Sequence, residues 1–258
     1  MIMLSDVTVR FGSRVILDNV SLHFPKNRTT AILGPNGRGK TTLLRTLLGQ
    51  QKMNSGLRHA PKIVGYVPQA VMLAHPYSAL DIVVMGRAAS LGLFGRPDKK
   101  EQNIALEAMA RVGVAHLTDT PFLRLSGGER QLVLLARAIA TGADVLILDE
   151  PAAALDLHNE MRLLDILTDI SQESDKSIIF TTHNPNHALN VADDVLMMMP
   201  DGSTIHGTVN ETLKTDNLTR LYGVDMQFIR LDNQAEEQSL VIPSFSLCRK
   251  CPAASVKF

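Results

Sequence analysis

The chain has 258 residues, of which 45% are hydrophobic and 20% charged, as expected for a folded globular protein rather than a disordered one. Lys and Arg together number 26, as do Asp and Glu, and the resulting net charge of zero argues against a general nucleic-acid-binding protein. The apolar runs are too short to cross a bilayer, and the first residues lack the basic flank and apolar length of a signal peptide, so we expect a cytosolic chain.

Short apolar runs rich in β-branched residues predict seven strands, at residues 2–11, 21–24, 29–33, 63–67, 145–148, 177–182 and 194–199. Between the fourth and fifth strands the apolar residues follow a helical period, which predicts helices over 98–112 and 129–140. We therefore expect an α/β fold in which residues 78–130 form a helical insertion.

The segment 34–42 reads Gly-Pro-Asn-Gly-Arg-Gly-Lys-Thr-Thr and matches the phosphate-binding pattern G-x-x-x-x-G-K-[ST]. In this pattern the glycines let backbone N–H groups curl around an anion, the lysine neutralises charge and the hydroxyl meets Mg²⁺. These roles fall to Gly34, Gly37, Gly39, Lys40 and Thr41. The sequence predicts a strand at 30–33 before the loop and a helix at 42–48 after it, which is the setting of a phosphate-binding loop. The alternative is a flexible Gly-rich turn.

Four predicted strands end at polar residues. They deliver the Gly34 loop, Gln69, the pair Asp149 and Glu150, and His183. In open parallel α/β sheets, ligands bind beyond the carboxyl ends of the strands. We therefore expect these residues, although distant in sequence, to converge on one site.

The adjacent carboxylates of Asp149 and Glu150 follow a strand that reads as buried. Two adjacent acids at such a position repel each other, which costs stability unless a cation neutralises them or their function requires them. Beside a phosphate-binding loop the natural cation is the Mg²⁺ carried by a nucleotide, so Asp149 supports the metal and Glu150 polarises the attacking water. The structural alternative is that both acids simply begin a solvated loop.

The segment Ser126-Gly127-Gly128-Glu129 fits a capping box at the start of a helix, with serine at the N-cap and glutamate three residues later. Glycine is a poor helix former, by about 1 kcal/mol against alanine in a helix interior. Two glycines in the first turn are reasonable if their N–H groups must approach a phosphate closely.

Together these segments resemble the nucleotide-binding subunit of an ABC transporter, over about residues 3–207. The resemblance implies that 34–42 is the Walker A loop, 125–131 the signature segment, 145–150 the Walker B strand and 154–156 the D-loop. It also implies that Gln69 is the Q-loop glutamine, that His183 is the switch histidine and that Phe11 stacks on adenine. The chain departs from the commonest family spelling at Ala152, Ala153 and Asn184.

The implied site is an ATP site with Mg²⁺. Its catalytic residues are Lys40, Gln69, Glu150 and His183, and its metal ligands are Thr41, Gln69 and Asp149. Its nucleotide contacts are Phe11, Gly34, Pro35, Asn36, Gly37, Arg38, Gly39, Lys40, Thr41, Thr42, Ser126, Gly127, Gly128 and Asp156. Structural alternatives remain for four of these: a core aromatic at Phe11, an ordinary loop residue at Gln69, a helix cap at Asp156 and a strand-end cap at His183.

The implied fold is a P-loop NTPase (RecA-like) core with an antiparallel β edge and an inserted α-helical subdomain. We expect a cassette over 1–227, with core segments 1–77 and 131–227 and the helical subdomain at 78–130, followed by a C-terminal tail at 228–258. The family arrangement is a head-to-tail homodimer in which each ATP contacts Lys40 of one chain and Ser126 and Gly128 of the other. ATP binding closes this dimer, and hydrolysis opens it.

The resemblance also implies partners: integral-membrane permease subunits, and an extracytoplasmic solute-binding protein that acts through them. The chain is then a peripheral protein on the cytoplasmic face of the inner membrane and binds no nucleic acid. Segments 81–87 and 91–97 resemble both iron-chelate and zinc/manganese importers, whereas 130–137, 182–188 and 217–224 look more like the ferric-siderophore, haem, vitamin B12 and molybdate group. A zinc/manganese importer and a non-transport regulatory ATPase are the alternatives.

The two cysteines, Cys248 and Cys251, form a C-x-x-C pair near the C-terminus. One such pair supplies half of a zinc site, and no histidine follows it. The alternatives are a metal or redox function and two reduced thiols in a surface tail.

Overall fold

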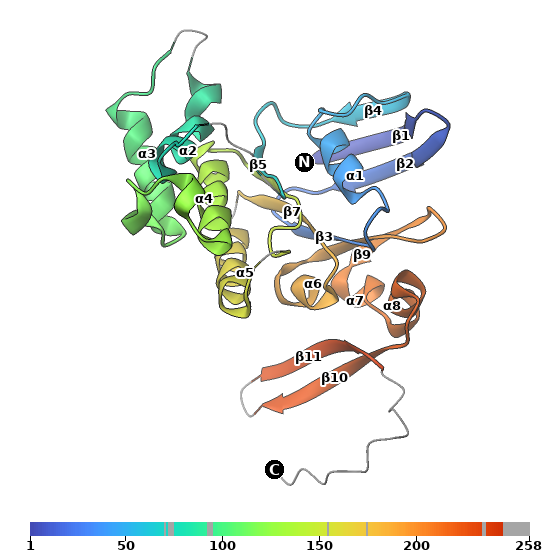
Figure 1. Cartoon of the computed structure of the whole chain (residues 1–258). Helices are drawn as coiled ribbons and strands as arrows, with labels where there is room; N and C mark the ends of the chain where they lie inside the picture. The colour runs from blue at the N-terminus through green and yellow to red at the C-terminus, as the bar shows by residue number, and fades with distance from the viewer. Residues whose placement is uncertain are drawn as a thin grey trace.

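A computed structural model describes residues 1–69, 71, 75–91, 95–153, 155–173, 175–233 and 236–244. Its centre is a six-stranded sheet with the order β5-β6-β7-β3-β8-β9 (Figure 1). The strands β5 (Gly65–Val67), β6 (Val145–Leu148), β7 (Ser177–Thr182), β3 (Thr29–Leu33) and β8 (Asp194–Met198) are parallel, and β9 (Thr204–Thr208) pairs antiparallel with β8. Most of the parallel strands are buried along their whole length because both faces of the sheet are covered.

A second sheet covers one face of the first. It consists of β1 (Ile2–Phe11), β2 (Arg14–Phe24) and β4 (Ser55–His59), in the antiparallel order β2-β1-β4. Between the two sheets lies α1 (Lys40–Leu47), which buries Leu43, Leu44 and Leu47 together with Ile32 of β3 and Leu4 of β1. This packing fixes the start of α1 against the end of β3, and so fixes the loop that joins them.

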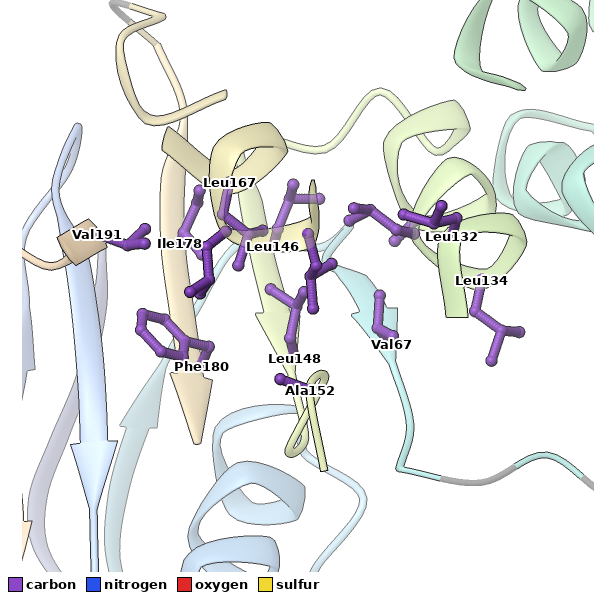
Figure 2. Close-up of a cluster of buried hydrophobic side chains, with 14 of the residues drawn as sticks. Val67, Leu132, Leu134, Leu146, Leu148, Ala152, Leu167, Ile178, Phe180 and Val191 are labelled. Carbon is purple, nitrogen blue, oxygen red and sulfur yellow. The ribbon is translucent and has the colours of Figure 1, made fainter. Parts of the chain in front are cut away.

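Helices cover the other face of the central sheet. They are α4 (Gly127–Ala140), α5 (Leu157–Ser171) and α6 (Pro185–Val191). Figure 2 shows Leu146 and Leu148 of β6 beside Ile178 and Phe180 of β7, facing Leu167 of α5. Alternate residues of the same strands, such as Ile147 and Ile179, belong to the cluster on the α1 side. The apolar runs are therefore continuous because each face packs on its own layer.

The segment between β5 and β6 is helical, as the sequence predicts. It contains α2 (Ala79–Val84), a 3₁₀ turn at Met85–Ser90, α3 (Lys99–Arg111), two short 3₁₀ turns at Ala115–Leu117 and Phe122–Arg124, and α4. Figure 1 shows α2, α3 and α4 gathered at one end of the molecule. The mixed α/β fold with an antiparallel edge and a helical insertion is thus confirmed. The predicted boundary at residues 130 and 131 lies within α4, and the domain division stays a prediction.

The chain continues after β9 with α7 (Val209–Thr212), α8 (Thr215–Tyr222) and a hairpin of β10 (Met226–Asn233) and β11 (Glu236–Pro243). The hairpin attaches to α6 through Asn186, whose side chain donates to the Val241 carbonyl at 3.0 Å and accepts from its N–H at 2.8 Å. It begins just before the predicted tail at 228–258 and projects beyond α6 in Figure 1. Cys248 and Cys251 lie outside the described residues.

Four predicted strands, at 2–11, 29–33, 145–148 and 177–182, have the bounds of β1, β3, β6 and β7. Three differ: β2 begins earlier than residue 21, β5 begins later than residue 63, and β8 ends at Met198. The apolar pattern does not predict β4, because its residues are mostly exposed and include Gly56. Edge strands of this kind are held by backbone pairing rather than by burial of side chains.

Candidate functional site

The phosphate-binding loop joins the end of β3 to the start of α1, as predicted. Gly37 and Gly39 have φ angles of 77° and 91°, in the left-handed region that favours glycine. A Cβ atom on Gly39 would lie only 2.7 Å from Cγ2 of Ile16, so the backbone here passes too close to β2 for any side chain. The result is a bare backbone turn at the N-terminus of a helix, which is a suitable cradle for an anion.

Lys40 is the first residue of α1, and its side chain is only 5% exposed. Its ammonium donates to the carbonyls of Gly34 at 2.7 Å and Pro35 at 3.3 Å, and its Nζ lies 3.0 Å from Oε1 of Glu150. Gln69 donates from Nε2 to Oε2 of the same glutamate at 3.2 Å. Three residues predicted from separate segments of the sequence therefore meet at one carboxylate.

The backbone of Glu150 adopts φ 46°, which is unusual for a residue other than glycine. Its N–H donates to Oγ1 of Thr181 at 2.8 Å, and that hydroxyl donates to Oδ1 of Asp149 at 2.9 Å. Such strained residues cost about 1–3 kcal/mol and cluster at functional sites. Thr181 thus holds the turn that aims Glu150 toward Lys40 and keeps Asp149 buried beneath it.

A cavity of about 340 Å³ opens over this cluster. It is lined by Arg14, Ile16, Asn36, Gly37, Gly39, Lys40, Thr41, Thr42, Gln69 and Glu150. Arg14 and Ile16 are not among the residues predicted from the sequence. They lie there because β2 pairs with β1, with Arg14 directly opposite Phe11, a contact for which the sequence has no periodic signal. Phe11 is 51% exposed but does not line the cavity.

The signature segment begins α4 with the predicted capping box. Ser126 Oγ accepts from the N–H of Glu129 at 3.3 Å, and Glu129 Oε2 accepts from the N–H of Ser126 at 2.7 Å. The hydrogen bonds from Ser126 lower the pKa of Glu129 below its ordinary value. Gly128 packs on the start of α5, where an added Cβ would lie 2.6 Å from Cγ of Asn159.

Asp156 is the N-cap of α5, and its Oδ1 accepts from the N–H of Asn159 at 2.8 Å. Gly127 lines a second cavity of about 310 Å³, which shares Gln69 and Glu150 with the first. Neither Ser126, Gly128 nor Asp156 is among the described residues that line the first cavity. The signature turn therefore approaches the site from one side without closing it.

His183 follows β7 and is exposed. Its carbonyl accepts from the hydroxyl of Tyr222 at 2.9 Å, and the N–H of the next residue, Asn184, donates to Oγ1 of Thr182 at 3.0 Å. Burial raises the pKa of the Tyr222 hydroxyl, which keeps it a donor. Within the described part of the chain, His183 does not line the cavity that holds Lys40 and Glu150.

The oxygens available near the phosphate-binding loop fit Mg²⁺. Thr41 and Gln69 line the cavity, whereas Asp149 is 2% exposed and lies under the turn of Glu150 without lining it. Hydroxyl, amide and carboxylate oxygens are the ligands that Mg²⁺ takes from proteins, with the remainder from phosphates and water.

No helix in the described ranges has both the length and the apolar character needed to span a bilayer.

The comparisons with known proteins agree with this geometry. The profile of the ABC transporter family matches residues 17–153. A molybdate import ATP-binding protein from Haemophilus influenzae is 36% identical over 82% of this chain and 83% of its own length. A Helicobacter pylori protein named as a probable iron chelatin transport ATP-binding protein is 33% identical over 89% of this chain and 95% of its own.

A solved structure described as an inward-facing metal-chelate type ABC transporter has a chain that is 31% identical to this one. It superposes with a TM-score of 0.89 over 95% of this chain and 98% of that chain. The superposition therefore covers nearly the whole of both chains. With a family match over more than half of its residues and this fold, the chain belongs to the ABC transporter family and is one of its ATP-binding ATPases.

Proposed function

We propose that this chain is the ATP-hydrolysing subunit of an importer for an iron chelate or a related metal-containing solute. The observation that carries the hydrolytic part is the meeting of Lys40, Gln69 and Glu150 at one cavity beside a bare-backbone loop. The solute class is supported by the relatives named for molybdate and iron chelatin transport and by the metal-chelate type structure.

ATP would bind with its phosphates over the loop 34–39 and the start of α1. Backbone N–H groups of the loop and the ammonium of Lys40 suit the phosphates, and Thr41 suits the metal. Lys40 is already paired with Glu150, so the phosphates must displace that carboxylate from it. Phe11 and the newly identified Ile16 lie on the β1–β2 side and suit the nucleoside.

Hydrolysis requires a water molecule to attack the γ-phosphorus while the bond to the β-phosphate oxygen breaks and ADP leaves. Glu150, once released from Lys40, can accept the proton of that water, and Gln69 and His183 can orient the reacting groups. Mg²⁺, held by Thr41, Gln69 and Asp149, would neutralise charge on the phosphates. The left-handed backbone at Glu150 supports this role because strain of that kind persists where a group must be aimed.

A second copy of the chain would complete the site. Gly128 lies in the first turn of α4 with a helix N-terminal N–H group, and Ser126 is the N-cap with a hydroxyl, but neither residue lines the cavity of its own chain. A head-to-tail homodimer would place them, and Asp156, over the nucleotide of the partner subunit. ATP would then hold the two chains together, and hydrolysis would release them.

A membrane permease is the proposed partner for a groove of about 940 Å³ on the helical insertion. The groove is lined by Tyr77, Asp81, Val84, Met85, Ala88, Ala89, Leu91, Gly95 and Pro97. Its mostly apolar floor suits an amphipathic helix on the cytoplasmic side of a permease. A solute-binding protein outside the membrane would act through that permease, and the chain would be peripheral on the cytoplasmic face.

The decisive experiment couples turnover to uptake. The chain is reconstituted in liposomes with the permease that co-purifies with it from membranes, and ATP hydrolysis and uptake of a ferric chelate are measured together. Glu150→Gln should abolish both activities, and Gln69→Ala should lose permease-stimulated hydrolysis while still binding ATP. Turnover of Glu150→Gln at the wild-type rate would contradict the catalytic assignment.

Two results would favour the alternatives. Uptake of free zinc or manganese, but not of the chelate, would indicate a zinc/manganese importer. Failure of any multi-span protein to co-purify, with another stable partner in its place, would indicate a non-transport regulatory ATPase.

A further inference from the structure

A buried histidine close to His183 has no part in the proposed chemistry. His187 lies on α6 and is only 6% exposed. Its Nδ1 is 2.9 Å from Oγ1 of Thr182, and its Nε2 is 2.7 Å from Oε1 of Glu160 on α5. Both ring nitrogens are therefore engaged, by two elements that are separate in the sequence.

One tautomer satisfies every partner in this chain of contacts. Oγ1 of Thr182 accepts from the N–H of Asn184 at 3.0 Å and, with a neutral ring, donates its own proton to Nδ1 of His187. Nε2 then carries the ring proton and donates it to Glu160. The chain Glu160–His187–Thr182 is thus a continuous, directed set of hydrogen bonds.

The hydrogen-bonded series Glu160–His187–Thr182 joins the turn that carries His183 to the first turn of α5. At one end Thr182 and Asn184 flank His183, so the hydrogen bond between them defines the turn that carries the His183 side chain. At the other end the N–H of Glu160 donates to the carbonyl of Asp156 at 2.9 Å, in the first turn of α5. Asn159 of the same turn contacts Gly128 of the signature segment.

Burying polar groups in this apolar layer costs stability, so the network needs an explanation other than stability. Ala188 and Val191, on the same helix as His187, belong to the buried apolar cluster beneath this layer of helices. The side chain of His187 is 8% exposed and that of Glu160 is 23% exposed, and replacing a buried ionic or polar pair by apolar side chains of similar volume is often neutral or stabilising. A buried histidine bonded at both nitrogens is therefore better explained by a need for fixed orientation than by stability alone.

We propose that Glu160 and His187 are positioning residues that fix His183 relative to the first turn of α5. This inference rests on the proposed role of His183 in hydrolysis. A displacement of the Asp156 turn, where a second subunit would make contact, would shift Glu160, then His187 and Thr182, and so move His183. The placement of His183 would in this way depend on the surface that meets the partner.

The test compares two substitutions at one residue. Glu160→Gln keeps a carbonyl oxygen that can accept from Nε2 of His187, whereas Glu160→Ala removes the acceptor. The matched control is Asp165→Ala, an exposed acidic residue further along the same helix. ATP turnover is measured for each full-length variant, and the eight histidine rings are followed by NMR after ring ¹³C labelling, with the His183 signal assigned from His183→Gln.

We expect Glu160→Ala to shift the His183 ring signal and to lower kcat about tenfold with KM within about twofold, because a misplaced catalytic group slows chemistry more than binding. Glu160→Gln should restore both readouts, and Asp165→Ala should change neither. An unmoved His183 signal in a folded Glu160→Ala protein would overturn the proposal.

Loss of kcat in Glu160→Gln as large as that in Glu160→Ala would also overturn it. The ring signal does not depend on turnover. A wild-type protein without ATPase activity would therefore contradict the proposed function, while the NMR comparison would still decide the positioning of His183.

Discussion

The two glycine-rich segments of this chain differ in how completely the chain itself surrounds them. The phosphate-binding loop has an exposed tip at Asn36, Gly37 and Arg38, but its end is enclosed: Gly39 lies against Ile16, and Lys40 is 5% exposed and bonded to two carbonyls and Glu150. The signature turn is open: Ser126 and Gly127 are exposed, and the capping hydrogen bonds of Ser126 and Glu129 lie within the turn itself.

This difference teaches which part of an ATP site one chain can build alone. The loop has a preformed cavity and a preformed cation, so a single subunit should bind nucleotide. The turn has helix N-terminal N–H groups, but within the described residues Ser126 and Gly128 do not line the cavity that holds Lys40 and Glu150. Changes at the loop should therefore affect binding by the monomer, and changes at the turn should affect only what a second subunit contributes.

The largest expected effect is at the loop. Lys40→Met removes a desolvated positive charge from the phosphate position, and truncating such a charge costs about 2–5 kcal/mol of binding free energy, or at least about a 30-fold weaker affinity. Isothermal titration of ATP into the monomer measures it. Lys62→Met, at an exposed lysine outside the cavity, is the control and should bind like the wild type.

A monomeric Lys40→Met protein that binds ATP as tightly as the wild type would mean that the enclosed loop is not the phosphate site. Its thermal stability should be measured in parallel, because the substitution also leaves Glu150, whose side chain is 11% exposed, without its cation.

The turn gives the next effect. Ser126→Asp keeps a good N-cap, so α4 should remain stable. It also places a carboxylate where the phosphates of the partner's nucleotide would lie, and like charges brought together cost several kcal/mol, so ATP-driven dimerisation should weaken at least about tenfold. Analytical ultracentrifugation with and without ATP measures it, while ATP binding to the monomer should stay within about twofold.

Ser78→Asp is a matched control for this substitution. Ser78 is also the N-cap of a capping box, with Asp81, at the start of α2. If Ser126→Asp dimerises with ATP as the Ser78→Asp protein does, then the open turn is not the surface that a second subunit completes.

The sequence predicts the enclosed segment more fully than its surroundings. The loop pattern and the acidic pair predict Lys40, Asp149 and Glu150 as site residues, because phosphate and metal chemistry restrict residue types and spacing, and the structure brings Lys40 and Glu150 together. Strands β1, β3, β6 and β7 are predicted with their bounds because burial on both faces gives unbroken apolar runs.

Other features leave no such pattern. Arg14 and Ile16 reach the cavity only through the pairing of β1 with β2. The ion pair of Lys40 with Glu150 joins residues far apart in sequence, and the His187 network depends on how α5 and α6 pack. Such contacts follow from tertiary structure, and a single sequence carries no periodic signal for them.

A smaller effect on ATP binding is expected at Glu150, which pairs with Lys40 of the loop. In this structure the carboxylate of Glu150 pairs with the ammonium of Lys40, which the phosphates of ATP would also need. Glu150→Gln removes this competition, and a buried ion pair whose attraction is largely offset by desolvation, with a net worth of about 1 kcal/mol, corresponds to about fivefold tighter binding. The measurement uses ATP with EDTA in the Ser126→Asp background, so that trapping of dimers cannot contribute. Weaker binding than in the parent protein would contradict the competition.

The smallest expected effect concerns the turn's own stability. Hydrogen bonds from Ser126 place the folded pKa of Glu129 below its ordinary value of 4.5. The ionised carboxylate therefore stabilises the fold above that pH, and this stabilisation is lost as the pH falls through the lowered folded pKa. Urea unfolding between pH 7 and pH 3 measures how the free energy of unfolding falls on the acid side, which we call the acid limb. Glu129→Gln should make this fall smaller, whereas Glu107→Gln, at an exposed position of α3, should not. An unchanged acid limb in Glu129→Gln would mean that the capping box does not hold the turn. The open segment would then need its partner for shape as well as for ligand binding.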